Sequence, residues 1–238
     1  DDIGKVFDSE PGAVIVPNIN LKPEIAYNFE TGISKIWNNK VKIETGVFYT
    51  YLDNAMVRRP FQFNGSDSII YNNVNSQIFA IQNAAFAFVY GAFLTFNAKL
   101  NNGFSLSVKA NYQYGREQMD DETLSPLRHV APAFGMAQLN YDIQKLRLMF
   151  NFFYNAEVSY NNLSRESQNS AFLFAKDQQG RPYSPSWYTL NLKFIYAFEE
   201  NFNLNGGIEN ITDIRYRTYT SGLSAAGRNF VLGLMIKF

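Results

Sequence analysis

Arginine and aromatic side chains are the residues of this sequence best suited to binding chemistry. A planar guanidinium can make two parallel hydrogen bonds to a carboxylate or a phosphate, and an aromatic ring can stack on a planar ligand. The candidate ligand-binding residues lie in or beside long polar stretches: Arg58, Arg59, Arg181, Tyr183, Trp187, Arg215 and Arg217. Each arginine is also typical of a solvated loop, and each ring of local packing, so both interpretations stay open.

Residues for catalysis or metal binding are sparse. The chain has one histidine, His129, and no cysteine. A lone histidine without a positioned serine or a second metal ligand supports neither a catalytic triad nor a metal site. The formal net charge is zero, which argues against a nucleic-acid partner recruited by charge. We therefore predict a protein that is not an enzyme, with no catalytic residues, no metal, no cofactor and no nucleic-acid partner.

Stretches of alternating polar and apolar residues are the elements that must position these side chains. Alternation with a period of two predicts a strand with one apolar face. The pattern occurs in residues 23–37, 40–52, 84–100, 104–115, 131–142, 145–160, 186–198, 202–211 and 229–238. The connections between them alternate between short and long, which is typical of an up-and-down membrane barrel with short periplasmic turns and long extracellular loops. A soluble β-sandwich, with shorter strands and no such order, is the alternative.

The last stretch shows the two faces most clearly. One face carries only large apolar residues: Phe230, Leu232, Leu234, Ile236 and Phe238. Charges in other stretches, such as Lys42, Arg147 and Lys193, fall on the face opposite the apolar one. A lysine or arginine facing lipid at the membrane midplane costs roughly 2–4 kcal/mol, so this separation favours a wall with lipid on one side and water on the other. The sequence predicts an all-β membrane barrel, an antiparallel up-and-down meander.

Two short motifs carry a family resemblance. Residues 207–238 are similar to the C-terminus of TonB-dependent outer-membrane receptors, in which an N-I-x-D box ends the penultimate strand. Here that box is residues 210–213, and it is followed by Tyr216 or Tyr219 and by a Gly-Arg-Asn-Phe segment at residues 227–230. Residues 20–24 (NLKPE) resemble a box that opens a strand midway round the same barrel.

The resemblance implies a place in a larger protein. Family members are 22-stranded barrels with a plug in the lumen, and nothing in this chain corresponds to a plug. We expect residues 1–22 to be an extracellular loop segment and residues 23–238 to be about nine C-terminal strands of the transmembrane barrel, in the bacterial outer membrane. An open sheet leaves unpaired edges in lipid, so the expected partners include the plug and earlier strands of the same receptor.

The resemblance also implies a function and further partners. The intact receptor is expected to import a scarce ligand by coupling to TonB, with an iron–siderophore complex as the expected cargo. Outer-membrane lipid, lipopolysaccharide and the barrel-insertion machinery are the other expected partners. That machinery would read the apolar face of the last strand, namely Phe230, Leu232, Leu234, Ile236 and Phe238. A passive pore, a transporter of oligosaccharide or another nutrient, and a soluble sugar-binding β-sandwich are the alternatives.

Overall fold

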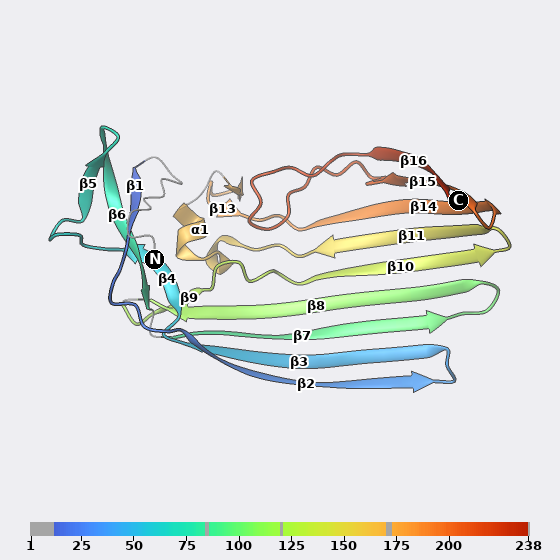
Figure 1. Ribbon diagram of the computed structural model, residues 1–238, viewed down its shortest axis with the longest axis horizontal. Helices are drawn as coiled ribbons and strands as arrows, with labels where there is room; N and C mark the ends of the chain where they lie inside the picture. The colour runs from blue at the N-terminus through green and yellow to red at the C-terminus, as the bar shows by residue number, and fades with distance from the viewer. Residues whose placement is uncertain (1–11, 84–85, 120, 170–172, 238) are drawn as a thin grey trace. The chain divides into compact units, whose positions relative to one another are not determined.

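Long strands lie side by side in sequence order in the computed structural model, which describes residues 12–83, 86–119, 121–169 and 173–237 (Figure 1). The sheet follows the order β16-β15-β14-β11-β10-β8-β7-β3-β2, and the short strand β9 (Leu124–Pro126) also pairs with β8. The long strands are β2 (Ile25–Trp37), β3 (Val41–Asp53), β7 (Phe86–Lys99), β8 (Phe104–Gln118), β10 (Phe134–Ile143), β11 (Leu146–Asn155), β14 (Trp187–Glu199), β15 (Phe202–Glu209) and β16 (Asn229–Ile236). Each predicted strand is present, so the predicted antiparallel meander is confirmed.

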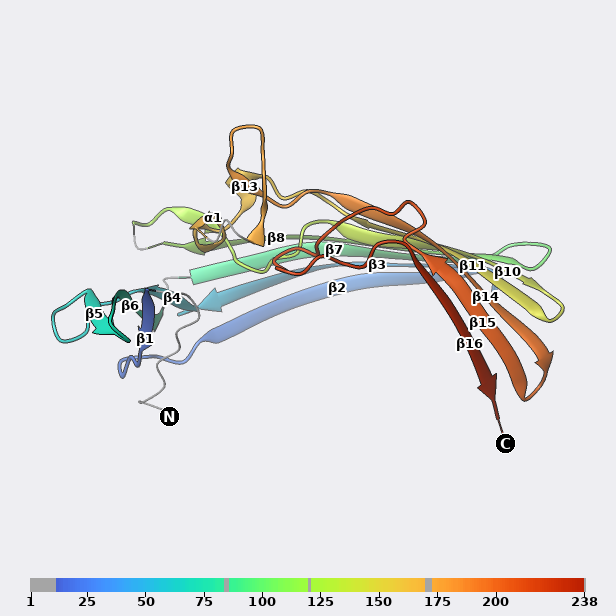
Figure 2. The same cartoon turned by 90° about the horizontal axis from the view of Figure 1, so that it is seen from above.

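The chain divides into two compact units. Unit 1 contains Asp1–Asn28, Thr50–Phe88 and Arg116–Ser125, and unit 2 contains Phe29–Tyr49, Val89–Gly115 and Pro126–Phe238. Within unit 2, Figure 2 shows β14, β15 and β16 turned away from the plane of β2 and β3. No helix among the described residues is long and apolar enough to cross a membrane.

The short turns follow from residues that tolerate a positive φ. Asn38 and Asn39 join β2 to β3 with φ of 48° and 51°, and Asn102 and Gly103 join β7 to β8 with φ of 57° and 82°. Two residues of positive φ give a turn whose twist matches that of paired strands. A Cβ on Gly103 would lie 2.1 Å from the backbone oxygen of Asp142, so no other residue fits there. The predicted alternation of short and long connections is confirmed.

The strand register gathers apolar side chains into one row across the sheet. Directly paired residues run through Leu106, Leu139, Phe150, Leu192, Ile208 and Phe230. One residue along, on the opposite face, the paired residues are Ser107, Gln138, Asn151 and Asn191. Leu139, Phe150 and Leu192 are exposed, whereas Asn151 and Asn191 are buried. This arrangement inverts that of a soluble protein, and it suits a wall whose exposed face lies in lipid.

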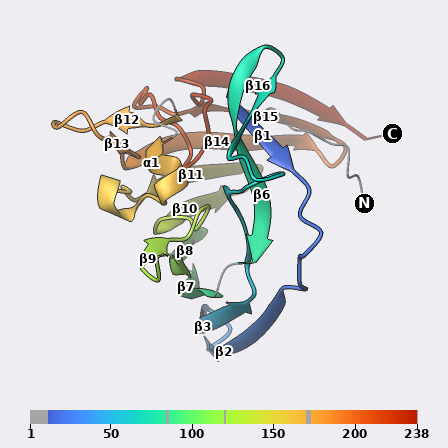
Figure 3. The ribbon, with the colours of Figure 1, turned by 90° about the vertical axis from the view of Figure 1, so that its left-hand side faces the viewer.

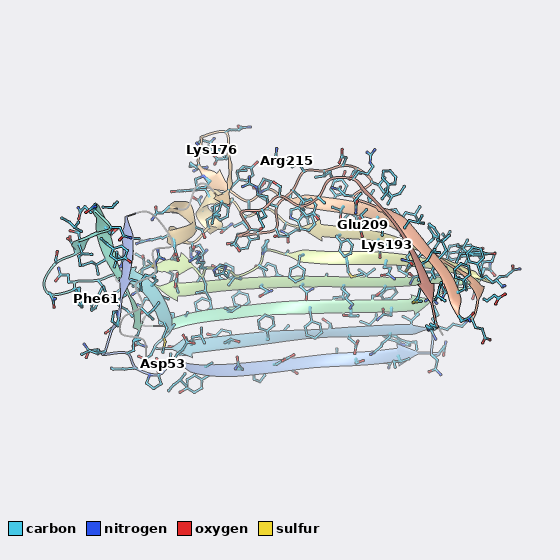
Figure 4. The ribbon with its side chains drawn as sticks, turned by 45° about the horizontal axis from the view of Figure 1, so that its top comes forward. Asp53, Phe61, Lys176, Lys193, Glu209 and Arg215 are labelled. Carbon is cyan, nitrogen blue, oxygen red and sulfur yellow. The ribbon has the colours of Figure 1, made fainter. Side chains whose placement is uncertain are left out.

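Two pairs of oppositely charged residues lie on the polar face of the sheet. Lys193 on β14 and Glu209 on β15 approach to 2.6 Å, and Figure 4 shows the two residues next to each other. Lys42 pairs with Glu44 at 2.8 Å. These pairs are half-exposed and contribute about 0–1 kcal/mol each to stability, so they lower the cost of charge at the wall rather than hold the sheet together.

Residues of unit 1 form a second, smaller sheet within stretches that were predicted to be loops. It consists of β1 (Ala13–Val16), β4 (Met56–Pro60), β5 (Ser68–Tyr71) and β6 (Val74–Asn83), with β1 parallel to β6. Its core contains Val14, Val16, Ile78 and Ala80, with Phe61 and Tyr71 packed against it. The loop prediction for residues 1–22 is therefore wrong at Ala13–Val16. Four consecutive apolar residues have no alternation, and their partner strand lies far along the chain.

The long connection between β11 and β14 is also partly ordered. It contains the short helices η1 (Tyr160–Asn162) and α1 (Arg165–Asn169) and the strands β12 (Ala175–Lys176) and β13 (Pro182–Tyr183). Figure 1 and Figure 3 together show α1 and β13 beyond the ends of β11 and β14. Strand β11 ends at Asn155, five residues before the predicted end at Tyr160. Past Asn155 the alternation continues, but Val158 pairs with Ser184 instead of with the sheet.

Candidate ligand-binding site

Two long loops of unit 2 pack against each other through a small apolar cluster. Residues 156–186 contribute buried Val158, Leu163 and Phe174, and residues 210–228 contribute Tyr219, whose ring centroid lies 6.5 Å from that of Phe174. Burial raises the pKa of Tyr219, and the nearby charge of Arg128 only partly opposes that rise. We call these two packed loops the loop pair.

The base of the second loop is held by one buried side chain. Asn210, in the N-I-x-D box, has a φ of 49° and is only 4% exposed. Its Nδ2 donates hydrogen bonds to the carbonyl oxygens of Ile214 (2.9 Å) and Ala226 (3.1 Å), and its Oδ1 accepts one from the Ile214 N–H (3.0 Å). The Asn210 N–H itself donates to Oδ1 of Asn191 on β14 at 2.7 Å. The side-chain amide of Asn210 thus joins both ends of the loop, and its backbone N–H joins them to the sheet.

A second contact closes the same loop. Oδ1 of Asp213 accepts a hydrogen bond from the Arg228 N–H at 2.7 Å, and Nε of Arg228 donates to the carbonyl oxygen of Ile211 at 3.0 Å. A Cβ on Gly227 would lie 2.7 Å from the same Asp213 oxygen, which accounts for a glycine there. Together, Asn210, Asp213, Gly227 and Arg228 form what we call the clasp. The sequence motif pointed to these residues, but only the structure shows what they do.

A pocket of about 230 Å³ lies within the loop pair, between Phe174, β13, the start of β14 and the clasped loop. The predicted residues Tyr183, Trp187, Arg215 and Arg217 all line it. The rings of Trp187 and Tyr216 stack with their centroids 4.2 Å apart, which gives the pocket an aromatic wall. Figure 4 shows Arg215 on the loop that leads to β16.

Hydrogen-bond donors of the pocket are left without acceptors. Nε1 of Trp187 is buried and has no hydrogen-bond partner within the described part of the chain. In the same part of the chain no carboxylate pairs with Arg215 or Arg217, whereas Arg128 pairs with Glu166 and Arg181 with Asp177. A buried donor without an acceptor costs about 1–3 kcal/mol, which is the cost at Trp187. Arg215 and Arg217 are exposed and give the pocket a cationic lining.

Arg181 does not line this pocket. Its guanidinium pairs with Asp177 at 2.9 Å and lies 5.1 Å from the centroid of the Tyr160 ring. Desolvation raises the pKa of the Asp177 carboxyl, but hydrogen bonds from Arg181 and Gln179 outweigh it and hold that pKa below its usual value. Figure 2 shows the β12–β13 hairpin, which these contacts brace, projecting away from the sheet. Arg181 thus stabilises its own hairpin.

Arg58 and Arg59 belong to unit 1 and are engaged in its packing. The Arg58 guanidinium lies 4.9 Å from the centroid of the Phe79 ring on β6. Arg59 is 7% exposed and donates a hydrogen bond to the backbone oxygen of Gln118. Phe61 and Tyr71, two aromatic residues of this region, pack on the core of the small sheet. Arg58 and Arg59 thus have structural roles in unit 1, and ligand binding by them stays a prediction.

Tyr216 is the pocket residue that the ligand prediction missed. It appears in the sequence only as a family-motif tyrosine, but it stacks on Trp187 and lies between two predicted arginines. An Arg-Tyr-Arg run in a polar loop is the signal that could have revealed it. No group of histidine, cysteine, aspartate and glutamate residues suited to a metal ion occurs among the described residues.

The predicted insertion signal lies on the exposed face of β16. Phe230, Leu232, Leu234 and Ile236 are 72%, 75%, 66% and 54% exposed. They continue the apolar rows of the sheet, since Phe230 is paired with Ile208 and Leu234 with Leu204. Phe238 lies outside the described residues. Recognition of this face by the insertion machinery stays a prediction.

Comparison with known proteins identifies the barrel. A family model described as "TonB dependent receptor-like, beta-barrel" matches residues 2–211. Two curated proteins of Haemophilus influenzae are similar: "Hemoglobin-binding protein A" is 29% identical over 90% of this chain, and "Hemoglobin and hemoglobin-haptoglobin-binding protein A" is 28% identical over 94%. The chain spans about a fifth of their length, 22% and 21%.

Solved structures show the same fold at lower identity. The siderophore receptor PirA from Acinetobacter baumannii superposes with a TM-score of 0.70 at 18% identity, covering 97% of this chain and 35% of that one. The copper transporter OprC gives a TM-score of 0.71 at 14% identity, covering 92% and 33%. The family is one of receptors and not of enzymes, and its barrels lie in the outer membrane of Gram-negative bacteria. This chain belongs to the TonB-dependent receptor β-barrel family.

Proposed function

We propose that this chain is the C-terminal part of the barrel of an outer-membrane receptor that takes up an iron-bearing ligand with energy supplied through TonB. The observation that carries the proposal is the pocket in the loop pair, where the stacked rings of Trp187 and Tyr216 lie beside Arg215 and Arg217. In a barrel of this family the long connections are extracellular, so a pocket formed by them is open to ligands arriving from outside.

Haem taken from haemoglobin is the cargo that the sequence relatives favour. Both relatives named above carry haemoglobin binding in their names, at 29% and 28% identity. The iron–siderophore complex predicted from sequence is the second candidate, and its support among solved structures, at 18% identity for PirA, concerns the fold alone. Haem and a catecholate siderophore both combine conjugated rings with anionic oxygens, which suit an aromatic pocket with cationic side chains.

The proposed partners follow from the same assignment. Exposed apolar rows on β16 and its neighbours would contact outer-membrane lipid, and the polar face would contact the plug and the lumen water. The other proposed partners are TonB, lipopolysaccharide, the earlier strands of the receptor and the insertion machinery. A passive pore and an oligosaccharide transporter are the rival functions, and neither needs TonB together with an iron source.

Growth under iron starvation tests the proposal. A strain lacking the receptor is supplied with haemoglobin or with a ferric siderophore as its sole iron source, with and without a restored receptor gene. We expect the restored gene to permit growth on one of these sources, haemoglobin first, and only when TonB is present. Growth that depends on the receptor but not on TonB would favour a passive pore. Equal growth with and without the restored receptor gene would overturn the proposal.

A further inference from the structure

The size of the pocket limits how much of a ligand it can hold. Pockets that enclose a whole drug-sized ligand have volumes of about 300–1,000 Å³. The pocket in the loop pair measures about 230 Å³, so it holds one ring or one edge of a larger ligand. The rest of such a ligand would extend out of the pocket.

The shape of the wall limits the kind of ring. Trp187 and Tyr216 are stacked on each other with an angle of 30° between their planes, so a ligand ring can add to an outer face of this stack. Flat conjugated groups gain most from such a wall, because offset stacking brings their faces into contact. A saturated, puckered ring would contact fewer atoms of the same wall.

The charge of the lining limits what the ring carries. Arg215 and Arg217 both line the pocket, and no ion pair to either is present in the part of the chain that the structure describes. Arg228, eleven residues beyond Arg217, instead donates to a backbone oxygen in the clasp. A lining with two such cations is complementary to an anionic oxygen.

We infer that the pocket binds one planar conjugated ring bearing a carboxylate or phenolate oxygen, with the ring against the Trp187–Tyr216 stack and the oxygen facing Arg215 and Arg217. The inference rests on the proposed function and names the part of the cargo that this site takes. Two sources have this chemistry: the carboxylate-bearing edge of a porphyrin, and an aromatic hydroxy-acid group of a siderophore.

Tryptophan fluorescence measures the binding directly. The chain has two tryptophans, Trp37 and Trp187, so the Trp37→Phe variant of the full chain in detergent micelles leaves Trp187 as the reporter. The first probe pair is 2,3-dihydroxybenzoate and catechol, and the second is protoporphyrin IX and its dimethyl ester. Each pair contrasts an anionic ring with a neutral ring of similar shape.

The expected result is a preference for charge that depends on the two arginines. We expect the anionic probe of at least one pair to bind about tenfold more tightly than its neutral partner. The Arg215→Gln/Arg217→Gln variant should reduce that ratio to about one, and Tyr216→Ala should weaken both probes. Lys176→Gln, which removes one positive charge from the neighbouring hairpin outside the pocket, is the matched control and should leave the ratio unchanged. The pair that responds identifies the source.

Other outcomes overturn the inference and leave the proposed function intact. Equal binding of anionic and neutral probes, or an unchanged ratio in the double arginine variant, would overturn it. Absence of quenching by every probe would also overturn it, provided that circular dichroism shows the β-structure of the chain. In either case growth on haemoglobin or on a siderophore could still require the receptor and TonB. Selective binding without TonB-dependent growth would instead contradict the proposed function alone.

Discussion

Two long connections of this barrel segment are ordered by opposite means. In unit 1, residues 53–83 build their own backbone ladder, and Ile78 is only 1% exposed in its core. In unit 2, residues 210–228 contain no strand among the assigned elements, only an isolated bridge between Arg217 and Ser224, and the side chains of the clasp hold their base. In the first connection the backbone groups hydrogen-bond to one another along the strands. In the second connection the clasp fixes the base of the loop.

The difference explains why the ligand pocket lies where it does. Strands β4, β5 and β6 bury their apolar side chains against β1, and this packing occupies the aromatic residues Phe61 and Tyr71. Between Ile214 and Ala226 the backbone of the loop pairs with itself, at Arg217 with Ser224 and at Tyr216 with Ala225, while the side chains of Arg215, Tyr216 and Arg217 line the pocket. Order at the base of a loop combined with open side chains above it is what a binding site needs.

The largest effect is expected in the small sheet. Ile78→Ala removes a side chain that is 1% exposed and should lower the local stability of unit 1 by about 2–5 kcal/mol. Hydrogen exchange of the amides of β6 measures the loss. Probe binding in the pocket should not change. A parallel loss of binding would show that the small sheet and the clasp do not order the two connections independently.

A smaller effect is expected at the clasp, but it reaches the pocket. Asn210→Ala leaves the Ile214 N–H without its acceptor and the Ile214 and Ala226 oxygens without their donor, at a cost of about 1–3 kcal/mol. We expect faster proteolysis within residues 210–228 and weaker probe binding, with β6 exchange unchanged. Asn210→Asp keeps the acceptor for the Ile214 N–H. Its proteolysis rate and its probe binding should therefore lie between those of the natural chain and those of Asn210→Ala. Retained probe binding in Asn210→Ala would show that the clasp does not position the pocket.

Ionisation of Tyr219 is expected to make the loop pair less stable at high pH. Burial raises its pKa above the ordinary value of about 10, so the folded loop pair favours the neutral phenol. The resulting stabilisation is complete below the unfolded pKa and is lost as pH rises through the folded pKa. Absorbance titration of tyrosinate, as the difference between the natural chain and Tyr219→Phe, should show Tyr219 ionising after exposed tyrosines. Ionisation together with exposed tyrosines would contradict its burial against Phe174.

The smallest effect is expected in the β12–β13 hairpin at low pH. Hydrogen bonds from Arg181 and Gln179 lower the pKa of the Asp177 carboxyl below its usual value. The stabilisation is present above the unfolded pKa of about 3.9 and is lost as pH falls through the folded pKa. Limited proteolysis of the hairpin in acid by an acid-stable protease measures it. Asp177→Asn is the control, and its cleavage should not depend on pH in this range.

The long strands could be predicted from sequence because each has two unlike faces. Alternation placed β2, β7 and β14 within a few residues of their observed ends, since a strand in a membrane wall repeats its signal over its whole length. Strand β11 was overextended because Ala156, Val158 and Tyr160 continue the alternation after the chain has left the sheet. The strand at Ala13–Val16 was missed because its ladder depends on a partner some sixty residues away.

The types of residue that line the pocket could be predicted from sequence, but not which individual residues line it. Residue chemistry pointed to Tyr183, Trp187, Arg215 and Arg217, which the fold brings together. The same chemistry pointed to Arg59 and Arg181, which the fold engages with the Gln118 backbone and with Asp177. Which arginine pairs with a carboxylate and which stays open depends on how each loop folds, and that depends on contacts between residues distant in sequence.

The meander has a consequence for closure of the barrel. Since neighbouring strands of the path from β2 to β16 are antiparallel and the path has nine members, β2 and β16 run in the same direction. If these two met, the seam would be parallel, whereas an up-and-down barrel is antiparallel at every junction. An odd number of additional strands must therefore separate them in a closed cylinder, so this sheet can seal the membrane only together with a complement that also has an odd number of strands.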